Sequence, residues 1–185
     1  KKALSIKPDY ADAYNNMGNI HVKQGNLDHA IDAFNKALTI KPEYTEGFIN
    51  LGVALKKQGK LNEAIKAYEK ALSIKPNYAN AYFNTGLILQ NEGKLNESIE
   101  AFEKVLSLNP DYEVARAHKL HQQAHICDWN SINKDSKLIP KLGISKKSVN
   151  PFSMLSLEDT PEHHHLRSKI YAKDTFPQNP IPLPN

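Results

Sequence analysis

The chain contains the stretch Tyr78-Ala-Asn-Ala-Tyr-Phe-Asn-Thr-Gly86, and it repeats an earlier pattern. The earlier copies are Tyr10-Ala-Asp-Ala-Tyr-Asn-Asn-Met-Gly18 and Tyr44-Thr-Glu-Gly-Phe-Ile-Asn-Leu-Gly52. Successive copies begin 34 residues apart, and each has an Asn two places before its Gly. A fixed period of this length predicts a stack of similar helical units, because one such unit cannot bury its apolar face alone.

The residues at equivalent positions are aromatic, small or Pro. Counting from Ala11, Thr45 and Ala79, they are Tyr14, Phe48 and Tyr82 at position 4; Gly18, Gly52 and Gly86 at position 8; Ala30, Ala64 and Ser98 at position 20; Phe34, Tyr68 and Phe102 at position 24; Ala37, Ala71 and Val105 at position 27; and Pro42, Pro76 and Pro110 at position 32. We expect the aromatic residues to fill the core between units.

Each repeat predicts two antiparallel helices, over 11–24 and 28–40 in the first copy. The dipeptides Gly25-Asn26, Gly59-Lys60 and Gly93-Lys94 predict the turn between the two helices, since Gly adopts positive φ without strain. Asp28, Asn62 and Asn96 are predicted N-caps of the second helices. The Pro at position 32 should end each second helix, because its ring excludes the preceding residue from the helical region. The Gly at position 8 costs about 1 kcal/mol inside a helix and indicates a close helix–helix contact there.

This code resembles the tetratricopeptide-repeat family over residues 1 to about 126. The resemblance implies an all-α, right-handed solenoid followed by a short helical junction and a Pro-rich tail. The predicted segments are the end of a truncated repeat at 1–10; repeats at 11–44, 45–78 and 79–112; a capping half-repeat at 113–126; a junction with short helices at 127–173; and a Pro-rich linker at 174–185. Because the chain opens inside a repeat and lacks an initial Met, we expect its original N-terminus, with any targeting signal, to be missing.

Positions 2, 6, 9 and 13 of each first helix fall on the side opposite the packing residues. They are Asp12, Asn16, Asn19 and Lys23 in the first repeat; Glu46, Asn50, Val53 and Lys57 in the second; and Asn80, Asn84, Leu87 and Asn91 in the third. Only the Asn at position 6 is constant. His118 takes this place in the half-repeat.

An Asn amide offers both donors and an acceptor, so it can pair with the N–H and C=O of an extended peptide whatever its side chains are. The first helices of successive repeats should lie about 10 Å apart, which is about the length of three residues of an extended peptide. One Asn could therefore bind about every third peptide residue. We therefore predict that Asn16, Asn50 and Asn84 bind extended segments of partner proteins. The further predicted contact residues on this face are Asp12, Asn19, Lys23, Glu46, Lys57, Asn80, Asn91 and His118. The alternative is that these amides are solvated or bond to neighbouring repeats. The clamp that other tetratricopeptide domains use for acidic tails needs cations, and here its slots hold Asn15, Asn19, Asn50, Asn80 and Asn84.

The sequence after the repeats resembles the junction in protein O-linked N-acetylglucosamine transferases and SPINDLY-type relatives. The resemblance rests on Cys127-Asp-Trp129, on Asn150-Pro-Phe-Ser-Met-Leu155 and on Arg167. It implies a basic helix over 131–142, a segment at 155–157, a short helix over 161–173 and the extended run Phe176-Pro-Gln-Asn-Pro-Ile-Pro-Leu-Pro184. The catalytic domain of that family would follow residue 185. Trp129 and Phe152 are expected to be core residues of the junction.

Composition narrows the function classes. The net charge is +4, but the basic residues are not interleaved with the aromatic residues that a nucleic-acid groove would show. The sequence has no apolar run long enough to predict a membrane span. The single Cys127 excludes an internal disulfide and favours a reducing, cytoplasmic location. Neither the histidines at 118, 121 and 125 nor the triplet at 163–165 matches a zinc spacing, so no metal site is predicted. The sequence also has no phosphate-binding glycine loop and no nucleophile elbow, so no cofactor or catalytic residue is predicted. Three functions remain open: peptide presentation to a glycosyltransferase, a stand-alone assembly module, and a scaffold for another enzyme such as a sulfotransferase.

Overall fold

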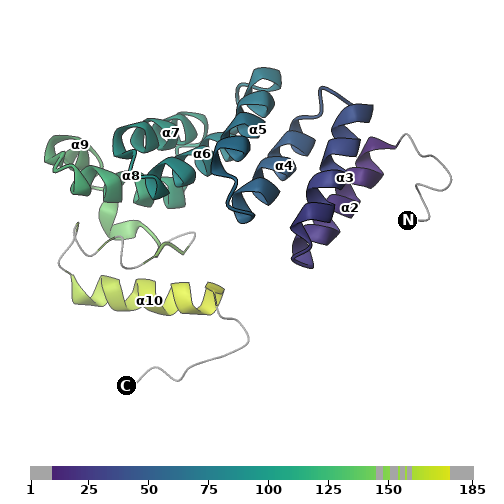
Figure 1. Ribbon diagram of the computed structural model, residues 1–185. Helices are drawn as coiled ribbons and strands as arrows, with labels where there is room; N and C mark the ends of the chain where they lie inside the picture. Colours follow the sequence, from purple (N-terminus) through teal and green to yellow (C-terminus); the bar gives the residue numbers. More distant parts are fainter. Residues whose placement is uncertain (1–9, 145–147, 151–153, 155–156, 158–159, 176–185) are drawn as a thin grey trace. The chain divides into compact units, whose positions relative to one another are not determined.

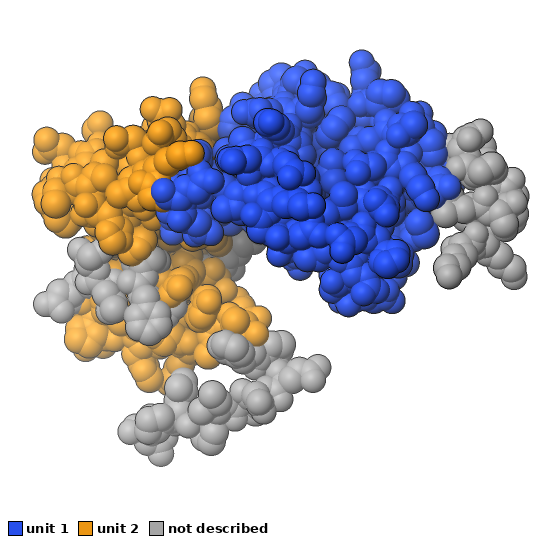
Figure 2. Space-filling model, in the orientation of Figure 1, with its two compact units in different colours: residues 1–92 blue, residues 93–185 orange. Residues whose placement is uncertain are grey.

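The computed structural model describes residues 10–144, 148–150, 154, 157 and 160–175, and the described elements are helices (Figure 1). They are α2 (Ala11–Lys23), α3 (Leu27–Ile40), α4 (Thr45–Lys57), α5 (Leu61–Ile74), α6 (Ala79–Asn91), α7 (Leu95–Leu108), α8 (Glu113–His125), α9 (Trp129–Lys134), the 3₁₀ helix η1 (Ile139–Lys141) and α10 (Pro161–Thr175). The chain forms two compact units, residues 1–92 and 93–185, which Figure 2 colours separately. The predicted segments 1–10 and 174–185 lie mostly outside the described residues.

In the first unit, α2 pairs with α3, and α4 pairs with α5, as the repeat code predicts. The position-24 aromatics Phe34 and Tyr68 are fully buried in this core. A Cβ added at Gly18 would lie 2.5 Å from the Phe34 ring, and one at Gly52 would collide with Tyr68 in the same way. Gly is therefore required at position 8 because the aromatic ring of the second helix lies directly against the backbone of the first.

The turn between the two helices of a repeat closes through backbone hydrogen bonds. Gly25, at φ +77°, donates to the Val22 carbonyl, and Asn26 donates to the His21 carbonyl at 2.9 Å. This pair of bonds is the Schellman arrangement, in which a left-handed residue ends the helix. Gly59 and Lys60 make the same bonds in the second repeat. The predicted Gly turns are confirmed.

The predicted N-caps of the second helices are wrong by two residues. The capping positions are Asn26, Lys60 and Lys94, and none of these side chains caps its helix. The carbonyl of residue 26 already accepts the first helical hydrogen bond, from Ala30 at 3.0 Å. The turn therefore delivers the chain into the helix at residue 27, and Asp28 lies inside the first turn of α3.

Tyr68 differs from the other position-24 residues because its buried hydroxyl has no hydrogen-bond partner in the described part of the chain. Burial also raises the pKa of this hydroxyl, so it stays protonated. Since an unsatisfied buried polar group costs about 1–3 kcal/mol, we expect Tyr68→Phe to raise the free energy of unfolding by about 1 kcal/mol. Urea denaturation followed by far-ultraviolet circular dichroism measures this change. Tyr82→Phe is the control, with an expected change below about 0.5 kcal/mol; a clear destabilisation by Tyr68→Phe would contradict the assignment.

The second unit is built on α8, which packs against α7 and α9. Its apolar core joins Leu120 of α8 to Ile132, Ile139, Leu142, Val149 and Met154 from the segment that follows. Arg116 stands where the earlier repeats carry an aromatic residue, and Lys119 stands where they carry Met17, Leu51 and Thr85. Both bind the Asp135 carboxylate, with Arg116 Nη1–Oδ1 at 2.6 Å and Lys119 Nζ–Oδ2 at 2.7 Å. The repeat code changes here because two positions of α8 bind the Asp135 carboxylate of the segment that follows.

Two expectations for the junction are wrong. The basic helix predicted over 131–142 is instead two short elements, α9 and η1, because α9 ends before Asp135, whose carboxylate binds α8. Trp129 is 50% exposed and so is not a core residue. Phe152 lies outside the described residues. The helix predicted over 161–173 is present as α10, which continues to Thr175.

Arg167 anchors α10 to the rest of the second unit. Its guanidinium is fully buried, and Nε donates to the Leu142 carbonyl at 2.7 Å. Nη2 donates to the Ile139 carbonyl at 2.8 Å. Ile139 is the first residue of η1, and its carbonyl also accepts from the Leu142 N–H at 3.2 Å, whereas Leu142 lies just beyond the end of η1. Arg167 therefore binds the backbone at both ends of the short helix.

Candidate peptide-binding surface

The three position-6 asparagines lie on α2, α4 and α6 of the first unit. Helix α2 contacts α4, and α4 contacts α6, so the first helices of successive repeats are neighbours (Figure 1). Asn16 is exposed, whereas Asn50 and Asn84 are half-buried. The structure thus brings these residues onto adjacent helices.

Asn50 forms a hydrogen bond to the preceding repeat. Its Nδ2 donates to Asn15 Oδ1 at 2.9 Å, and Asn15 is only 5% exposed. The bond satisfies the buried Asn15 oxygen and fixes the orientation of the Asn50 amide. Asn50 keeps its own oxygen and one N–H for a further partner.

Asn84 is held from two sides. Its Oδ1 accepts a hydrogen bond from Lys56 Nζ at 2.7 Å, and its Nδ2 donates to the Asn80 carbonyl at 2.9 Å. Burial, with a smaller contribution from the neighbouring Lys57 charge, lowers the pKa of Lys56. One N–H of the Asn84 amide and a second lone pair on its oxygen remain available.

Asn16 has no hydrogen-bond partner among the described residues. The row therefore consists of one open amide and two oriented amides, each able to donate to and accept from a ligand. The alternative interpretation, bonding to neighbouring repeats, applies to Asn50 and Asn84. This bonding does not use up either amide, and peptide binding stays a prediction.

The acids at position 2 lie close enough to tyrosines of their own repeats to affect the tyrosine pKa values. The Tyr44 hydroxyl donates to the Asp12 carboxylate, and burial, this hydrogen bond and nearby negative charge raise the pKa of Tyr44. Burial and the charge of Glu46 raise the pKa of Tyr78. Asp12 is half-buried and Glu46 is exposed. These acids border the Asn row where the first helices begin.

The remaining predicted contact residues are polar and at least partly accessible: Asn19 is half-buried, while Lys23, Lys57, Asn80 and Asn91 are exposed. Asn15 and Lys56 were missed by the sequence reasoning. Asn15 directly precedes Asn16 of the Asn row, and Lys56 directly precedes Lys57, so each is the sequence neighbour of a predicted contact residue. No sequence signal distinguishes these two positions as the ones that bond across repeats.

His118 belongs to the second unit. Its ring stacks on Phe102 with the centroids 5.3 Å apart. Burial, and to a lesser degree the neighbouring His121, lowers the pKa of His118 below its usual value. The imidazole is therefore mainly neutral at pH 7 and acts there as a packing residue of α8.

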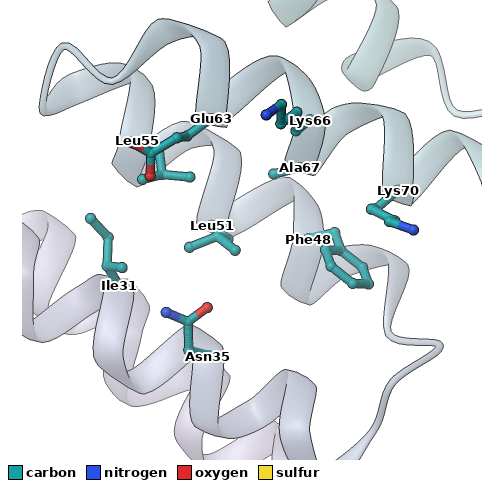
Figure 3. Close-up of a pocket in the computed structure, with 9 residues that line it drawn as sticks. All are labelled: Ile31, Asn35, Phe48, Leu51, Leu55, Glu63, Lys66, Ala67 and Lys70. Atoms are coloured by element: carbon teal, nitrogen blue, oxygen red, sulfur yellow. The ribbon is translucent and has the colours of Figure 1, made fainter.

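A separate pocket of about 280 Å³ lies among α3, α4 and α5. Phe48, Leu51 and Leu55 form its apolar wall on α4 (Figure 3). These residues are at positions 4, 7 and 11, on the other side of α4 from Asn50. Asn35 and Lys70 lie at its margin. This pocket is distinct from the Asn row.

The described residues contain no group of three or more His, Cys, Asp or Glu side chains placed to hold a metal ion. Within the same part of the chain, no helix combines the length and apolar character needed to cross a membrane.

Comparison with known proteins identifies the repeats. The family described as "Tetratricopeptide repeat" matches residues 11–44 and 79–112, and "TPR repeat" matches residues 54–93. These matches together span just over half of the chain. No curated protein matches the sequence.

Solved structures share the fold. "Crystal structure of MamA" is 25% identical, covers 67% of this chain and 72% of its own, and superposes with a TM-score of 0.63. "First TPR of Spaghetti (RPAP3) bound to HSP90 peptide SRMEEVD" is 26% identical, with coverages of 63% and 93% and a TM-score of 0.61. "Arabidopsis OM64 TPR domain" is 18% identical, with coverages of 62% and 95% and a TM-score of 0.60, and supports the fold alone. The chain belongs to the tetratricopeptide-repeat family.

Proposed function

We propose that the first unit binds extended peptide segments of partner proteins through the amides of Asn16, Asn50 and Asn84. The observation that carries this proposal is the orientation of two of these amides by hydrogen bonds that leave a donor and an acceptor available. An amide already held in place loses less side-chain entropy when it binds a ligand.

The expected affinity is modest. Neighbouring helices about 10 Å apart and an extended chain at about 3.3 Å per residue place one amide at about every third peptide residue. Net hydrogen bonds contribute about 0.5–1.5 kcal/mol each. After the cost of ordering the peptide, this predicts binding in the micromolar-to-millimolar range.

A structural relative, the first TPR of Spaghetti bound to the HSP90 peptide SRMEEVD, supports peptide binding as the class of function. That peptide is acidic. Tetratricopeptide domains that bind acidic tails share a clamp of side chains that includes Lys and Arg. Here Asn15, Asn80 and Asn84 occupy slots where the clamp needs Lys or Arg. We therefore favour recognition of the peptide backbone over recognition of an acidic tail.

The finer part of the proposal is that the bound segments are acceptor proteins for an O-linked N-acetylglucosamine transferase-type catalytic domain in a longer parent protein. It rests on the likeness of Cys127-Asp-Trp129 and the Asn150–Leu155 segment to the junction of those enzymes. The stand-alone assembly module is the second candidate. The coding sequence beyond residue 185 separates the two: a nucleotide-sugar domain supports the first and a stop codon the second.

Peptide binding is tested with a fluorescent, uncharged peptide of Ser, Thr, Ala and Val. Its length of about ten residues lets it reach all three asparagines of the row. We expect Asn16→Ala/Asn50→Ala/Asn84→Ala to weaken binding at least tenfold in fluorescence anisotropy, since several hydrogen bonds are lost. Asn16→Ala alone should weaken it several-fold without a loss of stability, because Asn16 bonds to no described residue.

The matched control is Asn62→Ala/Asn96→Ala, which removes two exposed amides from the second helices and should leave binding unchanged. Far-ultraviolet circular dichroism verifies that each variant keeps its helicity. Equal affinities for the wild type and the triple variant would rule out the Asn row as the binding surface. Tighter binding of SRMEEVD than of the uncharged peptide, insensitive to Asn16→Ala, would favour acidic-tail capture instead.

A further inference from the structure

Two histidines of α8 converge on the surface of the second unit. His121 and His125 are one helical turn apart, and their Nε2 atoms lie 3.2 Å from each other. The rings meet edge to face with their centroids 4.6 Å apart. His125 is exposed and His121 is half-buried, so the pair borders solvent. Neither the repeat fold nor the proposed peptide surface uses this pair.

We propose that His121 and His125 form a two-ligand clip for a late first-row divalent cation, such as Zn²⁺, Ni²⁺ or Cu²⁺. Two nitrogens that bind one tetrahedral zinc at 2.0–2.1 Å are about 3.3 Å apart, which matches the observed separation. Histidines four residues apart on one helix face are also the spacing by which helices present two imidazoles to one ion. Imidazole nitrogen is a ligand that suits these metals.

Binding requires a change of tautomer in one ring. In the metal-free pair, one neutral ring carries its proton on Nε2 and donates it to the Nε2 of the other ring, whose proton is on Nδ1. On binding, the first ring moves its proton from Nε2 to Nδ1 through solvent, so that both Nε2 lone pairs bind the metal. The exposed His125 ring can rotate to direct its lone pair at the ion. The other coordination positions are filled by water, since no third described side chain of a suitable type is placed to join the pair.

The burial pattern of α8 supports an outward-facing clip. Gln122 and Gln123, which lie between the two histidines, are each only 2% exposed. Their burial fixes the rotation of this part of α8 and keeps His125 toward solvent. The sequence does not reveal the clip because the spacing of its histidines matches no complete zinc signature.

The test uses the full chain without a polyhistidine tag, in a background in which His29 and His163–His165 are replaced by Gln. This background removes other imidazoles that are at least partly accessible and could compete for the metal. Zn²⁺ titration calorimetry should give one saturable site, and Cu²⁺ electron paramagnetic resonance should show two coordinated imidazole nitrogens. His125→Gln in this background should lower the Zn²⁺ affinity at least tenfold and leave a single-imidazole spectrum.

A second variant guards against a trivial effect on folding. His121→Gln should produce the same loss, while Gln24→His, an added exposed imidazole in the first unit, should not restore the two-imidazole spectrum. The absence of a saturable site in the background protein, or an unchanged affinity in His125→Gln, would overturn the proposal and show that the pair is only a hydrogen bond.

Discussion

Replacing Arg167 with Leu is expected to lower the free energy of unfolding of the second unit by about 3–5 kcal/mol. The buried guanidinium donates to the Leu142 and Ile139 carbonyls at 2.7 and 2.8 Å. Hydrogen bonds to a charged group contribute about 1.5–3 kcal/mol each, and a buried carbonyl left without its donor costs about 1–3 kcal/mol. Burying Leu avoids the cost of desolvating the guanidinium charge, and this offsets part of the lost stability.

The fluorescence of Trp129, the only tryptophan, reports unfolding of this unit directly. Lys169→Leu is the matched control, because Lys169 is exposed on the same helix and its loss should change stability by less than about 0.5 kcal/mol. Arg167→Lys should recover only part of the stability, since an ammonium lacks the planar fork that reaches two carbonyls. A denaturation midpoint that is the same in Arg167→Leu and the wild type would show that α10 does not depend on this anchor.

Replacing Asp135 with Ala is expected to lower the free energy of unfolding of the same unit by about 3 kcal/mol. The carboxylate pairs with both Arg116 and Lys119, and the side chains are only 11–14% exposed. Removing one partner of a buried ion pair typically costs about 3–5 kcal/mol, because uncompensated charge remains buried. We take the lower end because these groups keep some access to water, which screens the charges.

A compensating variant separates charge from packing. In a background with Arg116→Met and Lys119→Met, the further change Asp135→Ala should cost much less than 3 kcal/mol, because no uncompensated cation is left. Trp129 fluorescence in urea gives all four corners of this cycle. Equal costs of Asp135→Ala in both backgrounds would indicate that the loss comes from packing alone.

The sequence predicted the helices of the repeats because the relevant signals are local. Gly25 ends α2 through its own φ, and Pro42 ends α3 through the conformation of the residue before it. The close contact of Gly18 with Phe34 followed from the cost of Gly inside a helix. The N-cap error at Asp28 arose because the backbone hydrogen bonds of the Gly turn, which side-chain preference does not report, start the helix earlier.

For the candidate surface, the sequence predicted the row of Asn16, Asn50 and Asn84 but not what holds it. The partners Asn15 and Lys56 are 35 and 28 residues away from the amides they bind. Such pairs depend on how neighbouring first helices rotate against each other. Helical periodicity places a residue on a face, but it does not determine which side chain across the interface comes within hydrogen-bonding distance.

The sequence by itself thus determined the repeat period, the C-terminal ends of the repeat helices and the face that carries the asparagines, since these depend on spacing and on φ restrictions within a few residues. Only the tertiary structure decided the pairing of Asp135 with α8, the anchoring of α10 by Arg167 and the exposure of Trp129. The bonds concerned join residues 16 to 28 positions apart. Their partners are set by packing after the helices form, and no local pattern in the chain encodes that choice.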